Sequence, residues 1–186
     1  MADMLPVRSR KTTQVETATV DVRNYLTFLL GGESYGIDIL SIREIIEYAA
    51  PTEVPLVPPF IRGVMNLRGA VVPVIDLSLR FGRGATEARK RTCIVIMEVK
   101  HEEAVQQIGI VVDAVQEVIA LPLSEIEPPP NFGTRIRADF VSGMGKVDGK
   151  FILLLNVQKV LSIDEMAMLA RLSERATEGP DAVVGA

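Results

Sequence analysis

The sequence predicts a mainly β protein of two small, pseudo-symmetric β-barrel subdomains, with short helices and one helix near the C-terminus. Two observations support this fold class. Two runs of residues each occur twice along the chain, and short apolar segments alternate with turn residues at close intervals. Two copies of one unit imply a pair of related subdomains with a seam between them. Differences between the copies are therefore the first place to look for function.

The first repeated run extends from Gly36 to Ile46 and returns from Gly109 to Ile119. Both copies read Gly-Ile-x-(Ile/Val)-x-x-(Ile/Val)-x-Glu-(Ile/Val)-Ile. The second run, from Phe60 to Leu77, returns from Phe140 to Val157. Because the same residue types recur at the same spacing, we expect each copy to supply the same strands and turns.

These matches place the two copies at about residues 24–82 and 92–160, within one domain of residues 23–170. Residues 1–22 lack periodicity and are predicted to form a flexible tail. Residues 171–186 are predicted to hold the end of the last helix and a second flexible tail.

Each copy is expected to begin with a hairpin. The predicted strands are residues 25–30 and 35–39 in the first copy, and 92–99 and 105–112 in the second. The connecting turns are Gly31–Glu33 and the polar segment Lys100–Glu103. Proline-marked loops follow at Pro51–Pro59 and Pro122–Pro130, because proline does not fit helix interiors or central strands.

A second hairpin follows in both copies. Asp148-Gly149 is a strong signal for a tight turn with positive backbone angles, and Arg68-Gly69 occupies the equivalent place. Arginine suits such a turn less well, because it lacks the short side chain that tolerates this geometry. Pro73 lies inside the strand after Gly69, which predicts that this strand is at an edge or bulged.

Two helical segments are expected. Asp76–Gly82 reads as one helical turn closed by glycine, and the charged residues 83–91 then link the copies. A capping-box pattern at Ser162–Glu165 opens a helix that runs to about Arg175, and Gly179-Pro180 ends the ordered chain.

The composition and charge of the chain argue against several classes of partner. A net charge of −4 and a pI of about 5.2 argue against nucleic acid or anionic lipid as the main partner. The chain has no apolar run of signal-peptide or membrane-span length, which predicts a soluble, cytoplasmic protein. Its one cysteine, Cys93, lies in an apolar strand and is interpreted as a buried structural thiol.

Catalytic and metal-binding patterns are not found, so we expect no enzyme, no cofactor and no metal. His101 lies in a predicted turn, and one histidine with one cysteine makes neither a zinc site nor a nucleophilic triad. Asp38, Asp76 and Asp113 sit at strand ends, where capping is their usual role. An enzyme with an unrecognised carboxylate site and a nucleic-acid-binding barrel are the weaker alternatives; the basic cluster Arg89–Arg91 is most simply a solvated linker.

The remaining candidate is a surface for protein partners. Ile39, Ile42 and Ile45 recur at intervals of three, and such a stripe is either core or an exposed partner site. Val112, Val115 and Val118 form its twin in the second copy. Arg68, at a hairpin tip, is either solvated or functional.

The motifs resemble those of the CheW family of chemotaxis coupling proteins. The matching segments are Tyr35–Leu40, Ile42–Ile45, Phe60–Gly69 and Val72–Leu77, with Gly109–Asp113 and Phe140–Gly149 in the second half. The resemblance covers about residues 24–170. It implies a non-enzymatic adaptor made of two five-stranded, SH3-like barrels.

The resemblance also implies the partners. Proteins of this family join the histidine kinase CheA, through its regulatory domain, to the cytoplasmic tips of chemoreceptors. We therefore expect a cytoplasmic protein that is recruited to membrane-associated receptor arrays and needs no cofactor. The alternative is a paralogous adaptor for a chemosensory-like kinase pathway that controls surface motility or another output.

Residue by residue, the resemblance assigns two sites. The positions that match the family's kinase-facing residues are Leu26, Ile39, Ile42 and Ile45. The positions that match its receptor-binding region are Glu44, Asn66, Arg68 and Val118. The second copy has Asp148 where the first has Arg68, so the pseudo-symmetry is broken at a predicted partner site.

Overall fold

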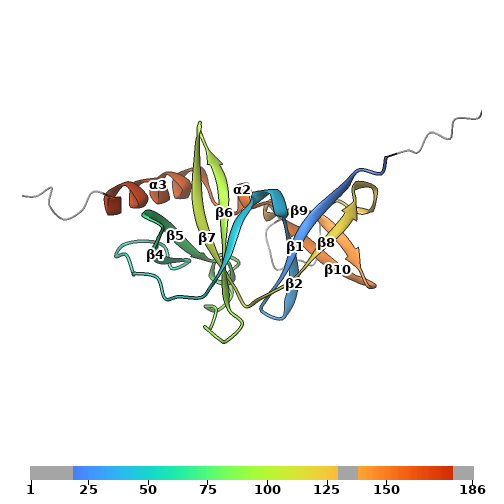
Figure 1. Cartoon of the computed structure of the whole chain (residues 1–186), viewed down its shortest axis with the longest axis horizontal. Coiled ribbons are helices and arrows are strands. Elements are labelled where there is room, and N and C mark those ends of the chain that lie inside the picture. Colours follow the sequence, from blue (N-terminus) through green and yellow to red (C-terminus); the bar gives the residue numbers. More distant parts are fainter. Residues whose placement is uncertain (1–18, 130–137, 178–186) are drawn as a thin grey trace, which may run out of the picture.

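A computed structural model describes residues 19–129 and 138–177. Most of the tail predicted at residues 1–22, namely residues 1–18, lies outside the described residues, as do residues 178–186 of the segment predicted at 171–186 and the end of the second proline-marked loop. The described chain forms two five-stranded sheets with short helices and a C-terminal helix, which confirms the predicted fold class (Figure 1). The strands are β1 Val22–Leu30, β2 Glu33–Asp38, β3 Ile42–Glu47, β4 Ile61–Leu67, β5 Ala70–Asp76, β6 Cys93–His101, β7 Ala104–Val112, β8 Ala114–Pro122, β9 Val141–Val147 and β10 Lys150–Leu155.

The two copies do not correspond one to one with the two sheets. The first copy supplies β1 to β5 and the second supplies β6 to β10. Yet the strand orders are β8-β1-β2-β10-β9 in one sheet and β3-β6-β7-β5-β4 in the other. Each sheet therefore combines the first hairpin of one copy with the remaining strands of the other. Each first hairpin is thereby completed by three strands of the other copy, and a two-stranded hairpin is only marginally stable by itself.

Four strand pairs join the copies: β1 with β8 and β3 with β6 are antiparallel, and the other two are parallel. β2 pairs with β10 through Tyr35 and Leu153, and β5 pairs with β7 from Val74 onward. All other strand pairs within the sheets are antiparallel. Pro73 thus lies in an interior strand and not at an edge. The strand tolerates it because the pairing with β7 begins only at the next residue, and a bulge follows in the pairing with β4.

Each sheet curls toward closure at its two edges. The chain after β3 pairs with β4 through Thr52 and Val64, and the chain after β8 pairs with β9 through Glu127 and Met144. Gly63 makes the first crossing possible: its φ is +145°, and a Cβ atom there would collide with the carbonyl oxygen of Thr52. The glycine of the repeated Phe-(Ile/Val)-x-Gly motif therefore serves to let a loop cross close above a strand.

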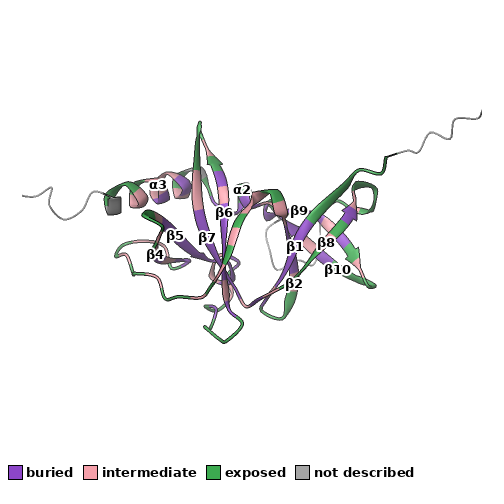
Figure 2. Cartoon of the chain, in the orientation of Figure 1, coloured by how far each residue is buried: buried purple, intermediate pink, exposed green. Residues whose placement is uncertain are grey.

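The apolar side chains form one large shared core and two smaller clusters. The shared core contains residues of both sheets and of the C-terminal helix, including Phe28, Tyr35, Met97 and Leu169. A smaller cluster belongs to each sheet, one around Val72 and the other around Leu154. Burial is concentrated along the strands, whereas the hairpin tips are exposed (Figure 2).

The two predicted helices begin where the sequence predicts, and the structure adds a third, short helix. Helix α1 (Leu77–Arg80) has Asp76 as its N-cap, and Gly82 after it adopts a φ of +76°. Helix α2 (Val157–Val160) is its counterpart in the second copy. Helix α3 (Ile163–Thr177) opens with the predicted capping box, in which the Ser162 amide donates to Glu165 Oε2 at 2.7 Å and the Glu165 amide donates to Ser162 Oγ at 3.2 Å.

The Arg80 side chain contacts residues of both copies where the copies meet. Its guanidinium lies 5.0 Å from the ring centroid of Phe60 and 5.1 Å from that of Phe140, the two equivalent phenylalanines of the repeat. It also donates to the Val160 carbonyl and forms an ion pair with Glu165 at 3.2 Å. One side chain therefore joins α1, α2 and α3.

Three local expectations are corrected. Lys100 and His101 belong to β6, and only Glu102 and Glu103 form the turn, because the long hairpin pairs as far as His101 and Ala104. Ile39 lies in a short 3-10 turn after β2 instead of extending the strand. Cys93 is half-buried at the start of β6, and its thiol donates to the Arg91 carbonyl.

Candidate functional site

The turn between β4 and β5 holds Arg68 in a fixed position. Arg68 and Gly69 have φ angles of +52° and +83°, the positive values expected for a tight two-residue hairpin turn. The Asn66 side chain supports this strained turn, since its Oδ1 accepts a hydrogen bond from the Gly69 amide at 2.9 Å. Asn66 therefore positions Arg68.

Arg68 forms a two-pronged ion pair with Glu44 of β3. Its Nη1 donates to Glu44 Oε1 at 2.9 Å and its Nη2 to Oε2 at 2.7 Å. The arginine side chain is 77% exposed and the glutamate side chain 24% exposed. A solvated pair of this kind contributes little to stability, about 0–1 kcal/mol. We call it the Glu44–Arg68 clasp; it presents a planar, pre-oriented guanidinium at the surface.

A β-bulge explains the apolar spacing of three in β3. Ile42 is opposite Met97 and Glu44 is opposite Ile96, so Arg43 has no cross-strand partner of its own. The extra residue places Ile42 and Ile45 on the same face of the strand and Glu44 on the other. A spacing typical of a helix is thus produced by a bulged strand.

The second copy repeats the bulge in β8. Val118 is opposite Leu26 and Val115 is opposite Phe28, so two residues of β8 lie opposite the single residue Thr27 of β1. Thr27 fills the gap: its hydroxyl donates to the Glu117 carbonyl at 2.9 Å and accepts from the Glu117 amide at 3.2 Å. The repeated motif therefore encodes a bulged edge strand in both sheets.

The second copy has two carboxylates, Asp148 and Glu117, in place of the Glu44–Arg68 clasp. Asp148 occupies the turn between β9 and β10 with a φ of +50°, like Arg68 in the first copy. Asp148 and Glu117, the counterpart of Glu44, both line a groove of about 730 Å³. Two carboxylates repel one another, so the second copy cannot form the ion pair that closes the first.

The predicted kinase-facing residues differ in exposure. Leu26 is only 4% exposed and belongs to the shared core, Ile39 and Ile42 are half-buried, and Ile45 is 42% exposed. The structure adds Leu40, which is 87% exposed in the 3-10 turn between β2 and β3. Sequence reasoning missed Leu40, because nothing in its local pattern shows that the turn lifts it out of the core.

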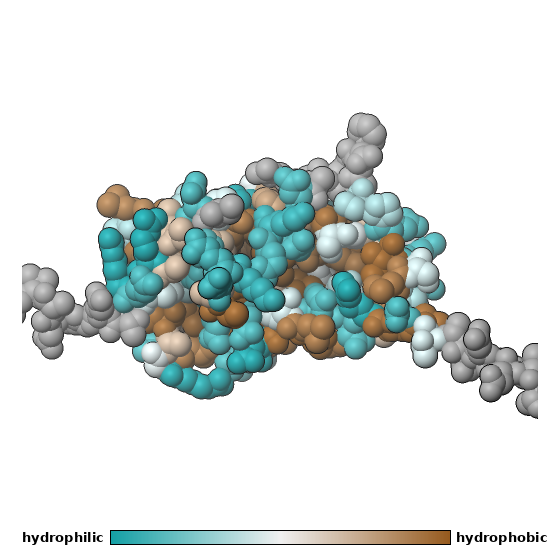
Figure 3. Space-filling view, turned by 90° about the horizontal axis from the view of Figure 1, so that it is seen from above, coloured by the Kyte–Doolittle hydropathy of each residue, from teal (hydrophilic) through white to brown (hydrophobic). Residues whose placement is uncertain are grey.

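The predicted receptor-facing residues form a group of three and one separate residue. Glu44 and Arg68 bond directly, and Asn66 supports the turn that carries Arg68. Val118 lies on the other sheet, where it is opposite Leu26 in the strand register and is 52% exposed. Hydrophobic surface lies in separate patches among hydrophilic side chains on the face shown in Figure 3.

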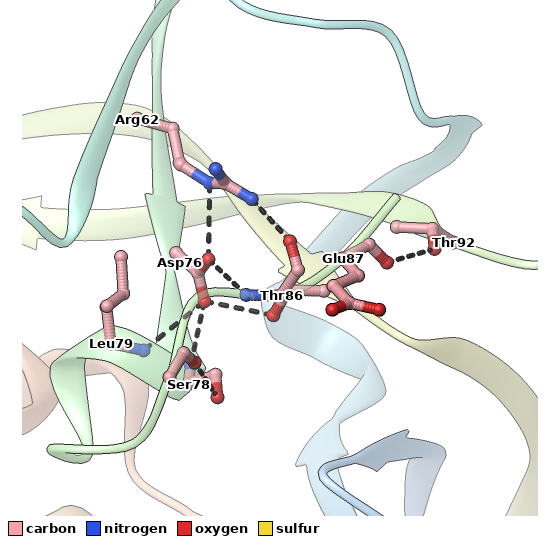
Figure 4. A network of polar contacts seen from close by, with 8 residues as sticks. Arg62, Asp76, Ser78, Leu79, Thr86, Glu87 and Thr92 are labelled. Carbon is pink, nitrogen blue, oxygen red and sulfur yellow. Dashed lines mark hydrogen bonds and ion pairs between the residues drawn. The ribbon is translucent and has the colours of Figure 1, made fainter. Parts of the chain in front are cut away.

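Asp38 and Asp76 have the expected capping roles, whereas Asp113 accepts a hydrogen bond from a distant turn. Asp38 Oδ1 accepts from the Leu40 amide at 2.9 Å, and Asp113 Oδ2 accepts from the Gly31 amide at 2.7 Å. Asp76 is fully buried and accepts from the amides of Ser78 and Leu79 (Figure 4).

The Asp76 carboxylate also holds the linker between the copies. It accepts from the Thr86 amide at 2.9 Å and from the Thr86 hydroxyl at 3.0 Å, and it lies 3.2 Å from Arg62 Nε (Figure 4). Arg62 in turn donates to the Thr86 carbonyl. Every oxygen of this buried carboxylate is occupied by the protein itself, which suits a structural role.

The described residues contain no group of three or more histidine, cysteine or acidic side chains that could hold a metal ion. His101 ends β6 beside a solvated turn. No helix in the described ranges is long and apolar enough to cross a membrane.

The chain is similar to a known family over most of its length. Residues 24–165 match the model of the CheW-like domain. The chain is 34% identical over 152 residues to "Chemotaxis protein CheW" of Klebsiella aerogenes, which covers 82% of this chain and 89% of the relative. It is 31% identical over 143 residues to the chemotaxis protein CheW of Rhizobium meliloti, covering 77% and 90%.

A solved structure has the same fold. The crystal structure of a scaffolding protein CheW from Thermoanaerobacter tengcongensis superposes with a TM-score of 0.71 at 38% sequence identity. The match covers 79% of this chain and 94% of that one.

Proposed function

The chain belongs to the CheW family, the non-enzymatic chemotaxis scaffold proteins that couple receptors to the kinase CheA, and we propose that it binds these partners through different parts of the surface described above. The observation that carries the proposal is the Glu44–Arg68 clasp. It is exposed, geometrically fixed and present in only one of two otherwise equivalent copies.

We place the receptor tip at the clasp and at Val118. A helical hairpin presents an apolar stripe bordered by charges, so its binding site needs exposed aliphatic surface next to a directed charge. Val118, exposed on the other sheet, supplies aliphatic surface and Arg68 supplies the charge, so one helical hairpin would have to reach both sheets. Asn66 contributes indirectly, because its side chain holds the turn that aims the guanidinium.

We place the regulatory domain of the kinase at the apolar residues around the β3 bulge. Ile45 and Leu40 are exposed, and the half-buried Ile39 and Ile42 adjoin them along the chain. Aliphatic surface removed from water contributes about 25 cal/mol per Å² before the costs of association. Leu26 lies in the core, so its proposed part is to support this surface from beneath.

With these partners, the proposed location is the cytoplasm, at the membrane-associated arrays in which receptors and kinase meet.

Reconstitution tests the proposal. Receptor, kinase and this protein are combined, and kinase autophosphorylation is measured with and without the chain. We expect receptor-dependent activation only when the chain is present. Absence of any effect with the cognate partners would contradict the proposed coupling.

Two variants then test the proposed kinase site. Ile45→Asp should weaken kinase binding while leaving the fold intact, because the side chain is already partly in water. Ile42→Asp tests the same surface but also disturbs packing against the shared core. If Ile45→Asp bound the kinase as tightly as the original protein, the kinase site would be misplaced.

A further inference from the structure

A second groove lies between the proline-marked loop after β3 and helix α3. It has a volume of about 550 Å³ and shares no lining residue with either proposed partner site. Val64 of β4 lies at its base. One face of α3 forms a wall, on which Met168, Arg171, Leu172 and Arg175 recur at intervals of three and four.

The groove is apolar between its walls. Val57, Met168 and Leu172 are partly buried and pack against the shared core, so this part of the groove is anchored. On the loop side, Leu56 is fully exposed at a φ of +62°. An exposed leucine held in a strained backbone conformation is costly to the isolated chain, and such strain is typical of binding loops.

Two arginines of the groove lack acidic partners. Arg171 and Arg175 are exposed, and neither forms an ion pair within the described part of the chain. In contrast, seven other arginines in that part have a carboxylate within 4.0 Å, namely Arg23, Arg43, Arg62, Arg68, Arg80, Arg83 and Arg89. The groove is thus a positive site on an acidic protein.

The backbone around the groove excludes an added β-strand at its base. The Val64 amide donates to the Thr52 carbonyl at 2.9 Å, and the Thr52 amide donates to the Val64 carbonyl at 2.8 Å. The edge of β4 is therefore already paired at this point, and the interior of α3 offers no free amides or carbonyls. An occupant must satisfy its own backbone hydrogen bonds, as a helix does.

We propose that this groove binds an amphipathic helix of a partner protein, in which an apolar stripe is bordered by acidic residues one turn apart. Arg171 and Arg175 are separated by four residues, about 6 Å along the helix axis. Glutamates at positions i and i+4 of a neighbouring helix have the same separation and can each accept a forked pair of hydrogen bonds from arginine. The stripe then covers Leu56, Met168 and Leu172.

A defined peptide tests the proposal. The probe is a synthetic helical peptide with leucines at i, i+3, i+4 and i+7 and two flanking glutamates one turn apart; its counterpart carries lysines in place of the glutamates. Binding is followed through the methyl signal of Met168, with the buried Met166 as internal reference. We expect the Met168 signal to shift with the acidic peptide, and the lysine peptide to bind about tenfold more weakly.

Matched charge reversals locate the contact. Arg171→Glu with Arg175→Glu should weaken binding of the acidic peptide about tenfold and improve binding of the lysine peptide. Lys90→Glu with Arg91→Glu makes the same charge change on the linker and should leave both affinities unchanged. Both proteins should unfold at the same temperature as the original.

Three outcomes would overturn the proposal: equal binding of the two peptides, equal weakening by both double variants, or no shift of Met168 at saturation. A fourth outcome would assign the groove to the chain itself. If truncation after Thr177 increased the affinity for the acidic peptide tenfold, the groove would be the binding site of the chain's own C-terminal residues and not of a partner helix.

Discussion

The two copies of the repeat share a scaffold and differ at its tips. Both have a bulged edge strand, a loop that crosses the strand at an equivalent glycine, and a tight turn with positive φ angles. At that turn the first copy has Arg68, which pairs with Glu44, whereas the second has Asp148 near Glu117. The two copies therefore share their backbone geometry, and single exposed side chains make their surfaces different.

The copies also differ where strand meets helix. The backbone bond is identical: the amides of Asp76 and Asn156 each donate at 2.8 Å, to the carbonyls of Phe60 and Phe140. The side chains diverge, since Asp76 is held by Arg62 and the linker, whereas Asn156 caps α2 with one bond from the Gln158 amide at 3.1 Å. A charged cluster in one copy corresponds to an ordinary cap in the other.

The largest effect is expected from breaking that cluster. Asp76→Ala removes a buried carboxylate and leaves Arg62 without its partner, which should lower the free energy of unfolding by about 3–5 kcal/mol. Asn156→Ala should lower the free energy of unfolding by only about 1 kcal/mol, the usual contribution of a helix N-cap. Chemical denaturation of both variants measures the difference. Equal losses would show that the ion pair adds nothing to capping.

The glycine crossings give the next largest effect. Gly63→Ala should destabilise the fold by about 3 kcal/mol, because the new methyl group meets backbone and the residue has a positive φ. Gly143→Ala should cost less, since its new methyl group meets mainly the Ile126 side chain, at 2.7 Å, and the Glu127 carbonyl, at 2.9 Å. Thermal unfolding of the two variants shows which substitution lowers stability more. The reverse order would mean that the first loop moves easily.

Arg68 tests the functional asymmetry. Arg68→Glu sets two carboxylates against each other and should reduce receptor-dependent kinase activation about tenfold, with the unfolding temperature unchanged, because the exposed pair contributes little to stability. Asp148→Arg is the control at the equivalent turn and should leave activation intact. If both variants reduced activation equally, the asymmetry would not be functional. Exchange of the charges, Glu44→Arg with Arg68→Glu, should restore only the ion pair.

The smallest expected effect is the contribution of Tyr35 to stability, and this contribution depends on pH. It occupies the position of Ile108 in the second copy, and its hydroxyl donates to Glu33 Oε2 at 2.7 Å. Burial, followed by this bond, raises the pKa of Tyr35 from 10.0 to about 12. The folded state thus favours neutral tyrosine, so this contribution to stability is complete below pH 10 and is lost as the pH rises toward 12.

Tyr35→Phe separates this contribution from other alkaline titrations. The difference in free energy of unfolding between the original protein and the variant should be constant up to pH 10 and shrink between pH 10 and 12. Denaturation at stepped pH measures it. A difference that stayed constant to pH 12 would contradict the raised pKa.

Much of the fold could be predicted because its signals are local. The Asp148-Gly149 turn, the Ser162–Glu165 capping box and the glycine after α1 depend on residues a few positions apart, and all three are present. The proposed site is less easily predicted. Asn66 and Arg68 were assigned through the family resemblance and remain predictions, whereas the exposure of Leu40 and the burial of Leu26 are seen only in the structure.

By itself the sequence determined the number of repeated units, the order of strands and turns, and the family. The tertiary structure decided which strands pair, and it exchanged them between copies, because hydrogen bonding across a sheet is indifferent to the origin of the strand. It also decided that Arg68 meets Glu44, and that Arg171 and Arg175 stand beside an apolar groove. These contacts join residues far apart in the chain, and their formation depends on packing that no local pattern records.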